Sequence, residues 1–288
     1  FWVATVHGLL RVRSGRLEPL TDREGLPAHG ATAVLEDREG NLWCGAGGLY
    51  RQLGLGAWVH HTPEAMGLPA ELVWRFARDE HGRLWAGTDR GLAFWNGQRW
   101  HALPETTEVT LLGLVTLPEG DILAAGTANT LFHVPLGGRR AVAYRGPETH
   151  GVGGTLRLFA DAEKRLWVLG ISGLHRLEWG PEGPRWRERV PMPEGVSLND
   201  RVALDPEGRS YFSSAQGLVE WHEGRWRRWG QKDGLRSDRV DWVTVTEDGL
   251  LWISYRDALG MTQARRTATG IEVLGQWDVA HGNLPTDA

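Results

Sequence analysis

The 288-residue sequence predicts an all-β fold, a seven-bladed β-propeller of four-stranded antiparallel blades. Three observations predict this architecture. A unit of about 42 residues recurs along the chain, which is a typical length for one propeller blade. Three separate sequence markers keep the same order in successive units. Within a unit, short alternating apolar runs are divided by turn residues, and no stretch shows a sustained helical period.

The first marker is the pattern Asp-x-x-Gly-x-Leu-Trp-x-Gly, which is clearest in residues 37–45 and 79–87. A second marker, Gly-Leu, follows it, as in Gly48-Leu49. A third marker, Gly-Leu-Pro, precedes the next copy, as in residues 67–69. Aligning the chain on the tryptophan of the first marker gives seven copies spaced 38 to 44 residues apart, at Trp2, Trp43, Trp85, Leu123, Trp167, Tyr211 and Trp252.

Residues 72–102 show how one unit is read as four strands. Residues 72–78 alternate as a pleated strand does, and Asp79 to Gly82 form a turn, because Asp bonds the nearby backbone and Gly supplies a positive φ. Residues 84–87 and 92–95 are the next two strands. Asn96-Gly97 is a strong hairpin signal and leads into a fourth strand over residues 99–102.

The tryptophan content supports the same fold. The chain has 16 Trp but only 6 Phe and 4 Tyr. In a propeller, both faces of each sheet pack on neighbouring sheets, so large flat side chains fill the wedge between blades. We therefore expect Trp43, Trp85, Trp167 and Trp252 to occupy equivalent, buried places on the second strands of their blades.

The ends of the sequence fall within a repeat. Phe1 lies in the second strand of the first unit, and residues 283–288 stand where the next inner strand should begin. We therefore expect residues 1–288 to form a single β-propeller domain, a fragment of a larger protein. One inner strand should be missing at the ring closure, and the residues that supply it either were cut away or lie in a neighbouring domain.

Composition excludes some partners and cofactors. The net charge of −4 and the isoelectric point near 6.3 lack the basic character of a nucleic-acid-binding domain. Cys44 is the only cysteine, so the fold cannot contain an intramolecular disulfide bond. No apolar run reaches the roughly 18 residues of a membrane span. No cofactor motif is recognisable, and we expect no cofactor and no metal.

The three markers together resemble the two-component regulator propeller repeat, best in residues 25–50 and 67–95. The resemblance extends over nearly the whole chain, although Leu123 and Tyr211 replace the tryptophan in two copies. It implies a periplasmic sensor region of a bacterial inner-membrane receptor. In such receptors a membrane helix and a histidine kinase or diguanylate cyclase module follow. It also implies contacts with neighbouring receptor domains and a homodimer formed through the parent protein.

Candidate catalytic groups are weak. His60, His61 and Glu64 resemble a metal pair with an acid, but adjacent strand residues point to opposite faces. The recurring acids at positions 37, 79, 161 and 205 indicate a turn role in every blade. Ser213 and Ser214 have no His or Asp at a spacing typical of a catalytic partner. Cys44 lies on a predicted strand beside Trp43, which favours a buried, unreactive thiol. We therefore predict no enzymatic activity for these residues.

Seven residues before the turn glycine, on the inner strand, the two-component regulator propeller repeat tends to have a small residue. Several copies in this chain depart from that pattern. Ala33 and Gly113 keep it small, whereas other copies carry Arg75, Arg157 and Arg201, and the last carries Trp242. Because inner strands line the central channel, these four side chains should converge at matching height. Arginine suits planar recognition of carboxylate, sulfate or phosphate, so an anionic small molecule or glycan is the expected ligand. The alternative is that each Arg pairs with an acid of a neighbouring blade or reaches solvent along an apolar wall.

The expected binding face is formed by the loops between second and third strands and between consecutive blades. These loops contain His7, Arg90, Asn129, Gln216, Asp257, His29, Glu71, Asp200 and Asp238. We single out Arg90, Asn129 and Gln216 as further ligand-binding candidates. Two other functions stay open: a propeller enzyme of the virginiamycin B lyase or gluconolactonase type, and a protein-interaction scaffold without a small ligand.

Overall fold

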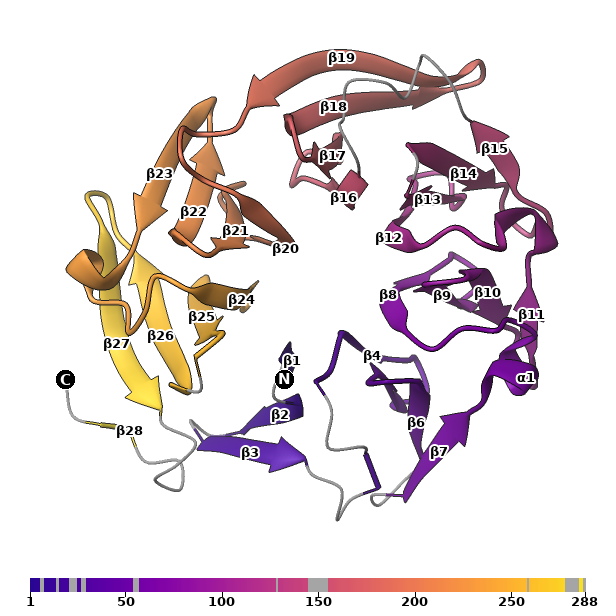
Figure 1. Ribbon diagram of the computed structural model, residues 1–288, viewed down its shortest axis with the longest axis horizontal. Helices are drawn as coiled ribbons and strands as arrows, with labels where there is room; N and C mark the ends of the chain where they lie inside the picture. Colours follow the sequence, from indigo (N-terminus) through magenta and orange to yellow (C-terminus); the bar gives the residue numbers. More distant parts are fainter. Residues whose placement is uncertain are drawn as a thin grey trace.

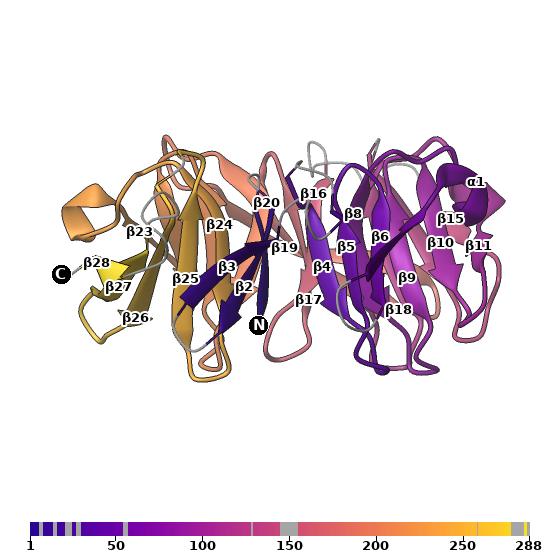
Figure 2. The same ribbon diagram turned by 90° about the horizontal axis from the view of Figure 1, so that it is seen from below.

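The computed structural model describes residues 1–5, 8–13, 16–20, 25–26, 30–53, 57–127, 129–144, 155–257, 259–277 and 285–286. Seven β-sheets stand around a central axis as a closed ring (Figure 1). Seen from the side, the ring is a flat disc whose strands run roughly along the axis (Figure 2). The predicted seven-bladed propeller is confirmed.

Each sheet uses strands that are consecutive in the chain. The first three sheets are β1 (Trp2–Thr5), β2 (Gly8–Arg13) and β3 (Arg16–Leu20); β4 (Ala33–Glu36), β5 (Leu42–Gly45), β6 (Leu49–Leu53) and β7 (Ala57–His61); and β8 (Val73–Arg78), β9 (Leu84–Thr88), β10 (Gly91–Trp95) and β11 (Trp100–Ala102). The next two are β12 (Leu111–Thr116), β13 (Ile122–Gly126), β14 (Thr130–Val134) and β15 (Val142–Tyr144); and β16 (Thr155–Ala160), β17 (Leu166–Gly170), β18 (Gly173–Gly180) and β19 (Gly183–Pro191).

The last two sheets are β20 (Leu198–Leu204), β21 (Ser210–Ser214), β22 (Gly217–His222) and β23 (Arg225–Trp229); and β24 (Val240–Val245), β25 (Leu250–Tyr255), β26 (Met261–Arg266), β27 (Ile271–Trp277) and β28 (Pro285–Thr286). Every paired neighbour runs antiparallel, as in β8 to β11. Short helical turns occur at α1 (Pro63–Met66), η2 (Pro104–Thr106) and η4 (Gln231–Asp233). Among the described residues, no helix is long and apolar enough to cross a membrane.

The repeat motif is explained by a hydrogen-bond network at the turn between first and second strands. The Asp79 carboxylate accepts bonds from the backbone N–H of Arg83 at 2.9 Å, from the Arg83 guanidinium at 2.6 Å and from the indole N–H of Trp85 at 2.9 Å. Gly82 has a φ of 79°, as the turn requires. The turn role of this Asp is confirmed, and the acid also anchors the tryptophan.

The same network recurs in other blades. Trp43 donates to Asp37 at 2.8 Å, Trp167 donates to Asp161 at 2.8 Å, and the Tyr211 hydroxyl donates to Asp205 at 3.0 Å. The last blade differs, because Thr246 stands in place of the acid and the buried indole nitrogen of Trp252 has no hydrogen-bond partner among the described residues. The spacing Asp-x5-Trp is therefore fixed by one side-chain hydrogen bond repeated around the ring.

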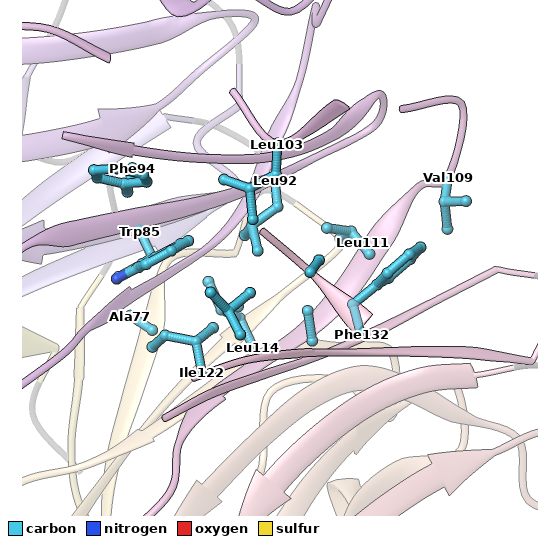
Figure 3. Packing of buried hydrophobic residues seen from close by; sticks show 13 residues of the cluster. Ala77, Trp85, Leu92, Phe94, Leu103, Val109, Leu111, Leu114, Ile122 and Phe132 are labelled. Atoms are coloured by element: carbon cyan, nitrogen blue, oxygen red, sulfur yellow. The ribbon is translucent and has the colours of Figure 1, made fainter. Parts of the chain in front are cut away.

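The core consists of clusters that join neighbouring blades. In the cluster of Figure 3, Trp85 and Phe94 lie with Leu114, Ile122 and Phe132 of the next blade along the chain. The four marker tryptophans, Trp43, Trp85, Trp167 and Trp252, are at most 3% exposed, and each lies on a second strand. Their predicted placement is confirmed. Because each cluster draws on two sheets, every blade is stabilised by the blades beside it.

The ring closes between the first and last sheets. Val3, Leu10 and Leu17 of the first sheet pack against Trp252 and Trp277 of the last. Among the described residues, the first sheet contains three strands, β1 to β3. Residues 285–286 form β28, which pairs with the outer strand β27. The expectation that the chain there begins an inner strand is wrong, because these residues use the free backbone groups at the outer edge of β27.

Candidate functional site

A cavity of about 260 Å³ lies among the inner strands of the ring. The strands that line it are β4, β8, β16, β20 and β24, which surround the centre in Figure 1. The described residues that line it are Thr32, Ala33, Val34, Trp74, Arg75, Phe76, Arg157, Arg201, Val202, Ala203, Leu204, Trp242, Val243, Thr244 and Val245. Its charged residues are three arginines, and none of its described lining residues is acidic.

The structure brings together the four side chains that the repeat comparison singled out. Arg75, Arg157, Arg201 and Trp242 all line the cavity. Their shared register is visible in the pairing: Arg75 lies opposite Gly87, Arg157 opposite Leu169, and Trp242 opposite Ser254, each two residues after its blade's marker aromatic. Inner strands β8, β12, β16, β20 and β24 also shift register at this height, as strands with an extra residue do.

The small residue kept at this position in β12 has a packing reason. A Cβ atom on Gly113 would lie 2.5 Å from the backbone nitrogen and from the Cβ of Leu158 on β16. Two inner strands therefore approach too closely there for a side chain. The neighbouring copies are free to carry the long side chains that reach the cavity.

Arg75 is buried and reaches across the channel. Its guanidinium forms an ion pair with the carboxylate of Asp200 and donates to the Asp200 carbonyl at 3.0 Å and to the Trp74 carbonyl at 2.5 Å. Strands β8 and β20 face each other across the centre of the ring (Figure 1). Within the described residues, the buried Nε atom of Arg75 has no hydrogen-bond partner. This side chain therefore ties two opposite blades and keeps one unused donor.

Arg201 is held by three neighbours. It donates to the Thr32 carbonyl at 2.8 Å, its Nε lies 3.5 Å from the Asp200 carboxylate, and its guanidinium carbon lies 4.2 Å from the centre of the Trp242 ring. Burial lowers the pKa of Arg201, and the charge of Arg75 lowers it further, against the opposing effects of Asp200 and Asp241. Two cations therefore share one carboxylate at the wall of the cavity.

Asp200 joins the two arginines and was missed as their partner by sequence reasoning. The sequence placed Asp200 in a loop between blades, but the residue lies in strand β20. Burial raises the pKa of Asp200, but the nearby charges of Arg75 and Arg201 outweigh burial and lower it below the usual value. The alternative, that each Arg pairs with an acid of a neighbouring blade, describes neither contact fully: Arg75 pairs with an acid of the opposite blade, and Arg201 lies beside an acid of its own strand β20.

Arg157 differs from the other two. Within the described part of the chain it makes no ion pair or hydrogen bond, and its Nε atom is buried without a partner. The indole nitrogen of Trp74, another residue of the cavity, is also buried without a partner. A buried donor without an acceptor costs free energy, so the cavity has unused donors at Arg75, Arg157 and Trp74.

The loop candidates Arg90, Asn129 and Gln216 do not line the cavity. Arg90 is exposed and lies 4.0 Å from Asp89, and Asn129 has a φ of 53°. Gln216 accepts a bond from the Ser197 backbone at 3.1 Å, so it holds the start of its own inner strand.

The other described loop residues also bond to nearby residues of the chain and do not line the cavity. Asp257 accepts bonds from Ser237 at 2.9 Å and from Arg239 at 2.6 Å. Asp238 accepts a bond from Gln231 at 2.8 Å, and Glu71 donates its backbone N–H to Asp89 at 3.1 Å. His7 and His29 lie outside the described residues. The cavity instead follows the inner strands, down to Leu204 and Val245 at their ends.

The two histidines of β7 occupy separate surroundings. His60 stacks on Tyr50 with ring centres 4.7 Å apart, and His61 stacks on Trp43 at 5.2 Å. Among the described residues, no group of three or more His, Cys, Asp or Glu side chains is placed to hold a metal ion. Burial lowers the pKa of His61 to about 4, with a contribution from Arg51, so this ring is neutral at pH 7.

This environment of His61 predicts an acid-dependent stability. In the unfolded chain His61 has its ordinary pKa of 6.5, whereas in the folded chain its pKa is about 4. Between these pH values the unfolded chain therefore binds a proton at His61 that the folded chain does not bind. The free energy of unfolding should therefore fall by about 1–3 kcal/mol between these pH values. His61→Phe should remove most of this loss, measured by urea unfolding at pH 7 and pH 4.5. His60→Phe, on the other face of β7, is the control, and an equal loss in His61→Phe and wild type would contradict the assignment.

The remaining nucleophile candidates are structural. The Ser214 hydroxyl donates to the Gly217 carbonyl at 2.7 Å, and the buried Ser213 hydroxyl has no hydrogen-bond partner in the part of the chain that the structure describes. Cys44 is fully buried, and burial raises the pKa of its thiol to about 12. A thiol with so high a pKa is a poor nucleophile at neutral pH.

The fold and the cavity define a seven-bladed propeller with a cationic central site. Comparisons with known proteins show which proteins of this class the chain is similar to. Residues 67–90 match the family model described as two component regulator propeller. The match confirms the resemblance drawn from the repeat markers. No curated protein matches the chain significantly.

Solved structures share the fold at low identity. Virginiamycin B lyase from Staphylococcus aureus is 14% identical with a TM-score of 0.64, over 85% of this chain and 83% of that chain. The extracellular domain of BT3049, described as a hybrid two component system of B. thetaiotaomicron, is 18% identical with a TM-score of 0.50, over 96% of this chain and 38% of that chain. PorZ of Porphyromonas gingivalis is 14% identical with a TM-score of 0.60, over 96% and 54%. At these identities the likeness shows the fold alone.

Proposed function

We propose that this chain is the ligand-sensing propeller of an extracytoplasmic signalling receptor, and that it binds a small anion in the central cavity without catalysing a reaction. The observation that carries the proposal is the charge of the cavity. Its described lining contains three arginines and no acid, and Arg157 has no partner among the described residues. An anion bound there would accept bonds from donors that are otherwise buried and unused.

The physical chemistry of arginine supports an anion as the ligand. A guanidinium presents donors in a planar fork that matches carboxylate, sulfate or phosphate oxygens. Bringing three such cations together costs free energy through repulsion and lost hydration unless negative charge compensates. Asp200 supplies one negative charge to Arg75 and Arg201. A bound anion near Arg157 would complete the compensation.

The receptor context follows from the repeat. A two-component regulator propeller repeat is present at residues 67–90, and the fold is shared with the extracellular domain of a hybrid two component system. Both observations support a sensor exposed outside the cytoplasm, in the periplasm of a cell with an inner-membrane receptor. The output would then be a kinase or diguanylate cyclase module of the same parent protein.

The lyase alternative is less well supported by the site. A histidine-to-alanine variant of the staphylococcal lyase is described as catalytically inactive. The described lining of the cavity in this chain contains no His, Asp or Glu that could serve as a general acid or base. We therefore favour binding over catalysis. Incubation with a streptogramin B, followed by mass spectrometry, should show no change in the antibiotic.

Calorimetric titration of the wild type and of Arg157→Gln tests the proposal. With gluconate, benzoate, inorganic phosphate and sulfate as probes, at least one anion should bind the wild type, and Arg157→Gln should weaken it by about 10–100-fold. Glu182→Gln removes an exposed charge on the β18–β19 turn and is the matched control. Equal binding by wild type and Arg157→Gln, or binding of none of the probes, would contradict the proposed site.

A further inference from the structure

We infer that the cavity selects a singly charged anion over a doubly charged one, and that Asp200 sets this selectivity. The inference rests on the proposed function and gives the charge of its ligand. Asp200 does not line the cavity itself. It acts through the two arginines that it contacts, so we describe it as a specificity-determining residue that need not touch the ligand.

The charge balance of the cavity supports this inference. Three cations, Arg75, Arg157 and Arg201, line the cavity, and Asp200 contacts two of them with different carboxylate oxygens. Asp241 adds a second negative charge near Arg201 and lies 3.9 Å from Arg256. Arg157 is the lining cation without an acid among the described residues. A bound anion therefore has one lining cation, Arg157, that no described acid contacts, whereas a second negative charge would have to compete with Asp200 for Arg75 or Arg201.

Geometry prevents Arg75 and Arg201 from serving a second anionic group. Arg75 is 4% exposed, and its guanidinium is held by the Trp74 carbonyl and by the carbonyl and carboxylate of Asp200. Arg201 is fixed by the Thr32 carbonyl and by the ring of Trp242. To contact either arginine, the second charge of a dianion would approach the Asp200 carboxylate. The second negative charge of the ligand and the Asp200 carboxylate would then repel each other.

Removing the charge of Asp200 should therefore change the preferred ligand. In Asp200→Asn the two arginines lose their counter-charge, and the cavity carries an additional uncompensated cation. The double variant Arg75→Gln with Asp200→Asn removes one charge of each sign and restores the original balance. It should keep the wild-type preference, which separates the effect of charge from any effect of altered packing.

The experiment measures the affinities of three matched pairs of acids by calorimetry: gluconate and glucarate, benzoate and phthalate, propanoate and succinate. For the pair that binds most tightly, the wild type should prefer the monoanion by at least about tenfold, and Asp200→Asn should shift this ratio toward the dianion by at least about tenfold. The double variant should return the ratio to the wild-type value, as should the control Glu182→Gln.

The possible results separate the two proposals. If no acid binds the wild type, the proposed function is wrong. If acids bind but the wild type prefers the dianion, or if Asp200→Asn keeps the wild-type ratio, the proposed function stands and the role of Asp200 is wrong. If Asp200→Asn does not fold, as judged by circular dichroism, the wild-type ratio and the ratio of the charge-balanced double variant decide the question.

Discussion

Truncating Trp85 to alanine is expected to lower the free energy of unfolding by about 3–5 kcal/mol, the range for deleting a large buried aromatic side chain. Trp85 is 0% exposed and lies in a cluster that joins two blades. Its ring centre is 4.9 Å from that of Phe94, and the Arg83 guanidinium carbon lies 5.2 Å from its centre. The variant removes all of these contacts and leaves a cavity between the sheets.

Urea unfolding followed by circular dichroism measures this effect. Trp226→Ala is the matched control, because this tryptophan on the outer strand β23 is only partly buried and donates to the Pro191 carbonyl at 3.1 Å. Its replacement should cost markedly less than that of Trp85. Equal losses in the two variants would mean that the marker tryptophans have no special place in the core.

Replacing Asp79 by alanine should cost about 3–5 kcal/mol of unfolding free energy, although the acid is a small side chain. Asp79 is 2% exposed and accepts the bonds of the Arg83 backbone, the Arg83 guanidinium and the Trp85 indole. Its removal leaves three donors without an acceptor, one of them on a charged group that is only 16% exposed. Unfolding in urea at pH 7 measures the loss.

The last blade provides a control in the opposite direction. Thr246 stands where four other blades carry the acid, and the buried indole nitrogen of Trp252 has no hydrogen-bond partner in the described part of the chain. Thr246→Asp should therefore raise the free energy of unfolding by about 0.5–1.5 kcal/mol, the usual net worth of one hydrogen bond. A loss in Thr246→Asp together with no loss in Asp79→Ala would contradict the anchoring role assigned to the acid.

The fold could be predicted from the sequence because four of the blades use the same hydrogen-bond network within one hairpin. The acid, the turn glycine and the tryptophan of residues 79–85 are linked by bonds within one hairpin, so their spacing recurs wherever that hairpin recurs. The same comparison found Arg75, Arg157, Arg201 and Trp242, because a departure from a repeat is visible against its other copies. Their common place in one cavity follows from the equivalence of the inner strands.

The partner of these arginines could not be found in this way. Asp200 and Arg75 are separated by 125 residues and lie on opposite blades, and no periodic pattern links them. The register of β20 also shifts between Leu198 and Val202, so the alternation of side chains cannot place residue 200. The sequence also predicted which loops share a face but not the bonds that their side chains make, and those of Gln216 and Asp257 are within their own blades.

The packing of the first sheet on the last has a consequence for how the ring assembles. Hairpins within a blade can form rapidly from neighbouring residues, but the contacts of Val3 and Leu10 with Trp252 and Trp277 join parts of the chain that are far apart in sequence. During synthesis, the apolar residues of the first sheet that pack against the last sheet stay exposed to solvent until the last sheet has been synthesised. Closure of the ring should then be a late, slow step of folding, and an intermediate with open terminal blades should be the species most prone to aggregation.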